Sequence, residues 1–150
     1  MPIPEIRESG RTVNLADIAA VEARFACTLP APYARFLREH NGGWPEPDAF
    51  RGLRPGDRAL VDFFLAVDGN ENTNLVQNAA FFREYHDVPG DLLPIARTPS
   101  GDLVCIGIGT ANHGEVHFWS HDHPVREKAT WKLADNFDSF LASFHEFVLP

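Results

Sequence analysis

The chain has 150 residues, 44% of them hydrophobic, and a formal net charge of −8 from 21 acidic residues against 13 Lys and Arg. That length favours a single domain, residues 1–150, with a sizeable buried core. The acidic balance argues against nucleic acid and against a membrane surface as partners, because both are bound by clustered Lys and Arg. It favours instead fast encounter with a basic protein. The alternative, that the negative charge simply keeps a small protein in solution, stays open.

No secretory signal and no membrane-spanning segment is predicted from the sequence. Residues 1–5 lack the basic and apolar regions of a secretory signal, and no apolar run approaches the ~18 residues of a membrane span. The two cysteines, Cys27 and Cys105, fall within a predicted helix and a predicted strand, which favours buried thiols in a reducing compartment. We therefore expect a cytoplasmic protein.

Two helices are predicted after an extended lead-in over residues 1–13. Asn14 can cap a helix over 15–27, since an Asn side chain accepts a free amide of the first helical turn. Leu29-Pro30 interrupts that pattern. A second helix over 32–40 begins with Pro32 and places its apolar side chains on one face at i, i+3 and i+4.

Asn41, Gly42 and Gly43 are predicted to end the second helix, because these residue types adopt positive φ at low cost. Within the first helix, Glu22 lies on the apolar face. A carboxylate there needs a partner, since burying it unpaired costs several kcal/mol. We expect Arg35, or backbone amides around residues 41–43, to bind Glu22 and to lock the two helices together.

The rest of the chain predicts strands and two further helices. The expected elements, in order, are an irregular loop with a short edge strand over 44–58, a strand over 58–67, a polar turn over 68–74, a helix over 75–86, strands over 93–96, 103–108, 115–121 and 129–133, and a final helix over 136–148. Turns between the later strands are typical of hairpins. The pattern predicts an α+β fold with a mainly antiparallel sheet flanked by N- and C-terminal helices, and a core over about 14–148.

The loop after the second helix holds the most suggestive binding residues. Trp44 stands between glycines and prolines, and Glu46 and Asp48 follow it. An exposed Trp beside acidic residues is typical of a hot spot for a basic partner. The alternative, that Trp44 folds back over the first two helices, stays open. We add the acidic residues of the next turn, Asp68 and Glu71, as candidate contacts.

The histidines raise the possibility of a metal site, because neutral imidazoles are good zinc ligands. His117, His121 and His123 share the parity of one strand, and His113 is near. Residues four apart on a strand lie roughly 13 Å from one another, which is too far for one ion unless the chain turns. We therefore expect no metal, no cofactor and no catalytic residue, and keep a His-dependent metalloenzyme as an alternative.

An ordered set of motifs resembles the SMI1/KNR4 (SUKH) family. The set comprises the helix containing Glu22, then Leu29-Pro30, Tyr33, Phe36-Leu37 and Asn41-Gly42-Gly43, followed by Leu93-Pro94-Ile95-Ala96, Gly101-Asp102, the segment 114–123 and Asn136 to Leu141. The resemblance covers nearly the whole chain from about residue 14. It implies an α+β fold and an immunity protein that neutralises a bacterial toxin by direct contact. A regulatory scaffold, like the members associated with cell-wall synthesis, is the alternative within the same family.

Overall fold

The computed structural model describes residues 3–50 and 59–146, and its helices and strands are short. The helices are α1 (Leu15–Phe25), α2 (Ala31–Glu39), α3 (Leu75–Tyr85), α4 (Phe137–Ala142) and the 3₁₀ turn η1 (Arg126–Lys128). The strands are β1 (Glu5–Arg7), β2 (Trp44–Glu46), β3 (Ala49–Phe50), β4 (Ala59–Leu60), β5 (Phe63–Phe64), β6 (Leu92–Arg97), β7 (Leu103–Gly107), β8 (Val116–Trp119) and β9 (Thr130–Ala134).

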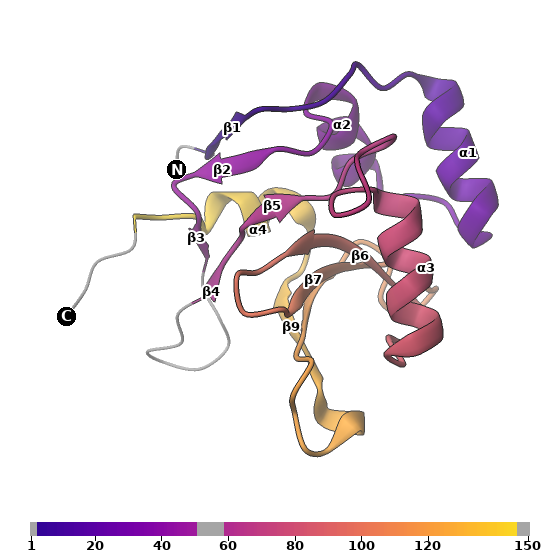
Figure 1. Cartoon of the computed structure of the whole chain (residues 1–150), viewed down its shortest axis with the longest axis vertical. Coiled ribbons are helices and arrows are strands. Elements are labelled where there is room, and N and C mark those ends of the chain that lie inside the picture. Colours follow the sequence, from indigo (N-terminus) through magenta and orange to yellow (C-terminus); the bar gives the residue numbers. More distant parts are fainter. Residues whose placement is uncertain (1–2, 51–58, 147–150) are drawn as a thin grey trace.

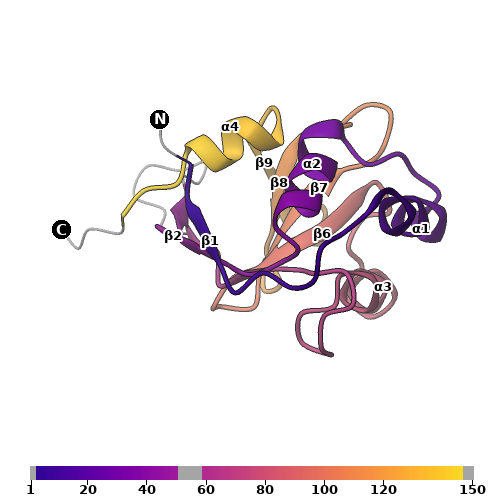
Figure 2. The ribbon, with the colours of Figure 1, turned by 90° about the horizontal axis from the view of Figure 1, so that it is seen from above.

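A five-stranded antiparallel sheet forms the centre of the molecule. Its strands follow one another in the order β5-β6-β7-β8-β9, so each pairs with its neighbour in the chain. Helices α2 and α4 lie over one face of the sheet and α3 lies over the other (Figures 1 and 2). The predicted α+β fold with a mainly antiparallel sheet is confirmed. In the described segments no helix has the length and apolar character needed to cross a bilayer.

Strand β7 shows why both faces of the sheet are covered. All five of its residues are buried, and their side chains alternate between two hydrophobic clusters because strand side chains point to opposite faces in turn. Val104 and Ile106 join the large cluster that includes residues of α1, α2 and α4. Leu103 and Cys105 join a smaller cluster with Phe82 of α3 and Trp119 of β8.

The strand predicted over 58–67 is two short strands that pair with different partners. Strand β4 pairs with β3, whereas β5 pairs with β6. The change of partner falls at two consecutive residues, since the Val61 amide donates to the Asp48 carbonyl and the Asp62 amide donates to the Arg97 carbonyl. The composition of this segment indicated β structure correctly but carried no signal for the change of pairing partner. Arg58, the first residue of the predicted strand, lies outside the described residues.

The lead-in is also more structured than predicted, because β1 pairs antiparallel with β2. The bridge Gly43↔Phe64 joins this ribbon to β5. Together these pairings bring the start of the chain beside the predicted loop at residue 44 (Figure 1).

Two predicted helices are shorter in the structure. Helix α1 ends at Phe25 rather than residue 27, because Ala26 takes a left-handed conformation with φ 51°. Helix α4 ends at Ala142, and the chain then extends so that His145 bridges Ala49 of β3. The last predicted helical residues, 147–148, lie outside the described residues.

Candidate functional site

A cleft of about 760 Å³ opens between the β1–β2 ribbon, the β4–β5 segment and the turn after β5. Four carboxylates line it, from Glu8, Asp48, Asp62 and Asp68, together with the ring of Trp44 and the guanidinium of Arg11. We call it the acidic cleft. Its carboxylates come from four separate segments, so only the folded chain brings them together.

Buried polar and glycine residues hold the frame of this cleft. The Asn41 side chain is 3% exposed, accepts from the Val67 amide at 2.7 Å and donates to the Val67 carbonyl at 2.9 Å. Gly42 and Gly43 have φ values of 74° and 99°. A Cβ at Gly42 would lie 2.6 Å from the Cβ of Ala66, and one at Gly43 would collide with the Arg7 carbonyl oxygen. The chain must therefore pass very close to its neighbours here.

Trp44 packs against the β1 strand and its extension, and not over the first two helices. Its indole Nε1 donates to the Glu8 carboxylate at 2.9 Å, and the Arg7 guanidinium lies 5.5 Å from the ring centroid. Arg7 also pairs with Glu46 at 2.7 Å. The Trp44 ring is thus held at the edge of the cleft while 37% of the residue stays exposed. A side chain ordered before binding loses little entropy on binding.

Arg11 already has two carboxylate partners. Its guanidinium donates to both oxygens of Asp17 at 2.8 and 2.9 Å, and to Asp68 at 2.6 and 2.9 Å. The hydrogen bond from Arg11, helped by the one from the Asn14 amide, lowers the pKa of Asp17 to about 2. Arg11 is therefore occupied. Asp48 and Asp62 accept no side-chain hydrogen bond from any other described residue, so the acidic cleft keeps its negative charge.

The predicted contact residues divide between two places. Trp44, Asp48 and Asp68 line the acidic cleft, and Glu46 stands beside it on β2. Glu71 faces a second cleft, described below. Sequence reasoning missed Glu8, Arg11 and Asp62 as cleft residues, because no local pattern shows that the lead-in lies beside residues 44–48.

The predicted partners of Glu22 are wrong, although the carboxylate is indeed bonded. Its Oε2 accepts from the Leu29 amide at 2.7 Å, which ties α1 to the connection that follows it. Arg35 instead donates to both oxygens of Asp138 at 3.0 Å, linking α2 to α4. The amide that Glu22 binds lies seven residues further along the chain.

The four histidines considered for a metal site do not come together. The His113 ring bonds to the Thr28 carbonyl, the His117 ring to Glu115, and His123 Nδ1 accepts from the Val125 amide. Each of these three rings has one nitrogen bonded elsewhere, and of the four histidines His121 belongs to a group of three candidate ligands.

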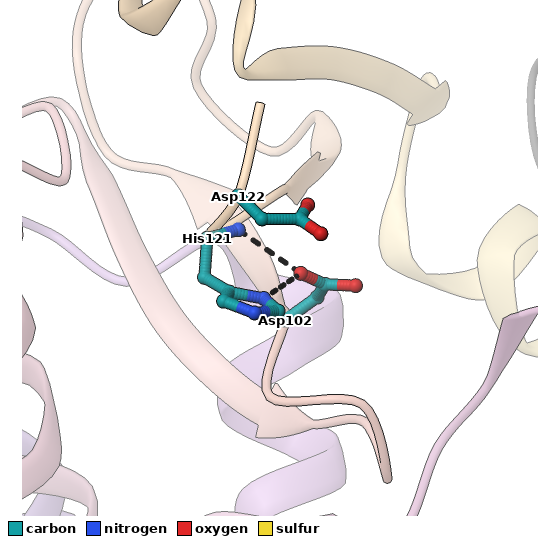
Figure 3. Close-up of side chains that lie close together, drawn as sticks. All are labelled: Asp102, His121 and Asp122. Atoms are coloured by element: carbon teal, nitrogen blue, oxygen red, sulfur yellow. Dashed lines mark hydrogen bonds and ion pairs between the residues drawn. The ribbon is translucent and has the colours of Figure 1, made fainter. Parts of the chain in front are cut away.

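His121 has two aspartates beside it at the end of β8 (Figure 3). Its Nδ1 lies 2.6 Å from Asp102 Oδ1, and its backbone amide donates to the same oxygen at 3.0 Å. In the part of the chain that the structure describes, one candidate metal-ligand group of three or more residues is found, namely Asp102, His121 and Asp122. Ser100 and Ser120 also donate to these two carboxylates, so the group is bonded internally and joins the β6–β7 turn to β8.

A second cleft, of about 690 Å³, lies between α3 and the ends of β6 and β8. We call it the α3 cleft. Its lining includes Glu71, Phe81, Phe82, His86, Arg97 and His121. The turn at residues 69–73 separates the two clefts, since Gly69, Asn70 and Thr73 line the acidic cleft and Glu71 and Asn72 line the α3 cleft.

The architecture is that of an α+β protein built on an antiparallel meander with helices on both faces. The model of the SMI1-KNR4 cell-wall family (SUKH_6) matches residues 15–141, and the chain belongs to this family. The chain is also 24% identical over 143 residues to the SPbeta prophage-derived uncharacterized protein YokK of Bacillus subtilis (strain 168). That match covers 82% of this chain and 70% of YokK. The resemblance identified in the sequence is confirmed.

Proposed function

We propose that the protein is a non-enzymatic, cytoplasmic immunity protein that binds a basic domain of a bacterial toxin through the acidic cleft. The observation that carries the proposal is that, among the described residues, four carboxylates and one guanidinium line the cleft beside Trp44, and two carboxylates already hold that guanidinium, of Arg11. Membership of the SMI1-KNR4 family supports it, because proteins of this family are often immunity proteins.

Binding would block the toxin by covering it. The carboxylates of Asp48 and Asp62 attract Lys and Arg side chains of the approaching partner, which raises the association rate. Trp44 then supplies a large, ordered apolar surface of the kind that dominates interface energies. Glu8 and Arg7 hold the indole in place beforehand, so the ring does not have to be ordered on binding.

The electrostatic part of the proposal is tested with the protein encoded by the neighbouring open reading frame, which the proposal expects to be a toxin. We expect the double variant Asp48→Asn, Asp62→Asn to bind at least tenfold more weakly at 50 mM salt than the native protein, and to lose part of the salt dependence. The matched control is Glu84→Gln, Glu127→Gln, which removes two exposed carboxylates that do not line the acidic cleft. Equal affinity in both double variants would contradict the role of the cleft, and absence of binding by the native protein would contradict the immunity function.

The anchoring role of Trp44 is tested separately. Trp44→Ala should weaken binding at least 30-fold at high salt, where steering is screened, because hot-spot aromatics contribute about 2 kcal/mol or more. Leu15→Ala, at an exposed apolar residue outside the cleft, is the control and should bind as the native protein does. A loss of equal size in both variants would place the contact elsewhere.

A further inference from the structure

The α3 cleft contains a guanidinium, that of Arg97, with no ion pair to any carboxylate of the described residues. Arg97, at the end of β6, is half-buried, and its guanidinium lies 5.2 Å from the ring centroid of Phe82. Within residues 3–50 and 59–146, no carboxylate forms an ion pair with it. Arg7, Arg11 and Arg35 each pair with acidic side chains. A partly desolvated guanidinium without a counter-ion attracts an anion, and its planar fork matches a carboxylate or a phosphate.

A second polar side chain, the His121 imidazole, lines the same cleft. The His121 ring is fixed through Nδ1 by Asp102, as Figure 3 shows. Nε2 forms no hydrogen bond to any other described residue, so it is the nitrogen left for a ligand. With the proton on Nδ1 facing Asp102, Nε2 is an acceptor for an N–H or O–H group of a ligand. Asp102 thus acts as a positioning residue for His121.

Part of the wall of the cleft is aromatic, beside polar residues that include Asn72, Gln77 and Asn78. Phe81 is 47% exposed, although it packs edge-on against Phe82 with ring centroids 5.3 Å apart. His86 lies beside both, at 5.2 and 5.3 Å between centroids. An exposed aromatic surface beside a guanidinium suits a flat ligand that also carries a negative charge.

We propose that the α3 cleft binds a small organic anion, with its carboxylate or phosphate held by Arg97 and its flat apolar body against Phe81 and His86. A volume of about 690 Å³ falls within the range of small-molecule sites. Glu71 on the rim disfavours a second negative charge and so favours a ligand whose charge is confined to one end. This site is separate from the protein-binding cleft proposed above and does not depend on it.

The test is a titration of the purified protein, followed by amide and arginine side-chain NMR shifts, with benzoate and with phenyl phosphate. Benzyl alcohol, which has the same flat body without the charge, is the ligand control. We expect saturable shifts at Phe81, Arg97 and His121 with at least one of the anions, and the stronger of the two identifies carboxylate or phosphate as the preferred group. No saturable shift with either anion, or equal affinity for benzyl alcohol, would overturn the proposal.

Variants locate the anion. Arg97→Gln should weaken binding of the anion at least tenfold, and Arg97→Lys should weaken it less, because it keeps the charge but loses the fork. Arg38→Gln, at an exposed arginine outside both clefts, should leave affinity unchanged. Unfolding curves in urea establish that each variant is folded. Binding that persists unchanged in Arg97→Gln would overturn the proposal. Binding that requires added zinc and disappears in Asp122→Asn would also overturn it, because the anion would then be held by a metal.

Discussion

The turn at residues 69–73 separates the two clefts, which differ in what their arginine side chains contact. In the acidic cleft, Arg11 is held by Asp17 and Asp68, and further carboxylates surround it. In the α3 cleft, Arg97 contacts an aromatic ring and no described carboxylate. The net charge of −8 therefore agrees with the local charge of the acidic cleft and not with the local charge around Arg97 in the α3 cleft. Local charge depends on which segments the fold brings together, and composition does not contain that information.

The frame of the acidic cleft provides the strongest test of this difference. Gly43→Ala should lower the free energy of unfolding by at least about 3 kcal/mol, because the new Cβ meets the Arg7 carbonyl and φ is 99°. Gly90→Ala is the matched control, since a Cβ there meets nothing within 4 Å. Urea unfolding measures both. Similar losses in the two variants would mean that β1 does not pass Gly43 as closely as described.

Asn41 gives the next largest expected effect. Asn41→Ala removes two hydrogen bonds and leaves the amide and carbonyl of Val67 without their partner, at a cost of about 2–3 kcal/mol. Asn72→Ala, in the turn at residues 69–73, removes an exposed side chain and should change the free energy of unfolding by less than about 0.5 kcal/mol. Thermal unfolding of the two variants side by side separates a buried bridge from a surface amide.

The Arg11 link should make the acidic cleft sensitive to acid. Because the pKa of Asp17 is lowered from 3.8 to about 2, its contribution to stability is complete above about pH 4 and is lost as the pH falls through 2. Asp17→Asn keeps an acceptor for the Asn14 amide but removes the charge. The difference in urea midpoint between native and variant proteins should therefore shrink between pH 4 and pH 2, and a constant difference would contradict the ion pair.

Arg97 should matter least for stability. Arg97→Gln should change the free energy of unfolding by no more than about 1 kcal/mol, because the guanidinium contacts only the Phe82 ring among the described residues. Arg83→Gln is the contrasting variant, since Arg83 donates to the Gly90 carbonyl at 2.6 Å and also lies over Phe25. Calorimetry of the two variants compares them, and a larger loss at Arg97 would reveal a structural role.

Local signals predicted the elements of the fold well. The cap at Asn14 and the apolar faces of the helices placed α1, α2 and α3 within two residues of their observed bounds. Strands that pair with their neighbours, β6 to β9, were recognised for the same reason, since a hairpin needs only local turn chemistry. Pairing between distant segments, as in β1 with β2, leaves no such mark on either segment.

The candidate site follows the same rule. Trp44, Asp48 and Asp68 could be selected from residue type and loop context, and the structure places them in one cleft. Arg97 and His121 could not be selected as a pair, because they come from different strands and neither forms a motif with its neighbours. At Val61 and Asp62 the chain changes its pairing partner from β3 to β6. Strand β5, which lines the acidic cleft, therefore lies against β6.

That switch makes neighbouring peptide groups report on separate parts of the molecule. The Val61 amide is bonded to the carbonyl of Asp48, next to β3, and the Asp62 amide to that of Arg97 in the central sheet. Hydrogen–deuterium exchange at these consecutive positions therefore follows the opening of two different pairings. Exchange rates measured at Val61 and Asp62 alone would therefore report on the opening of both sheets.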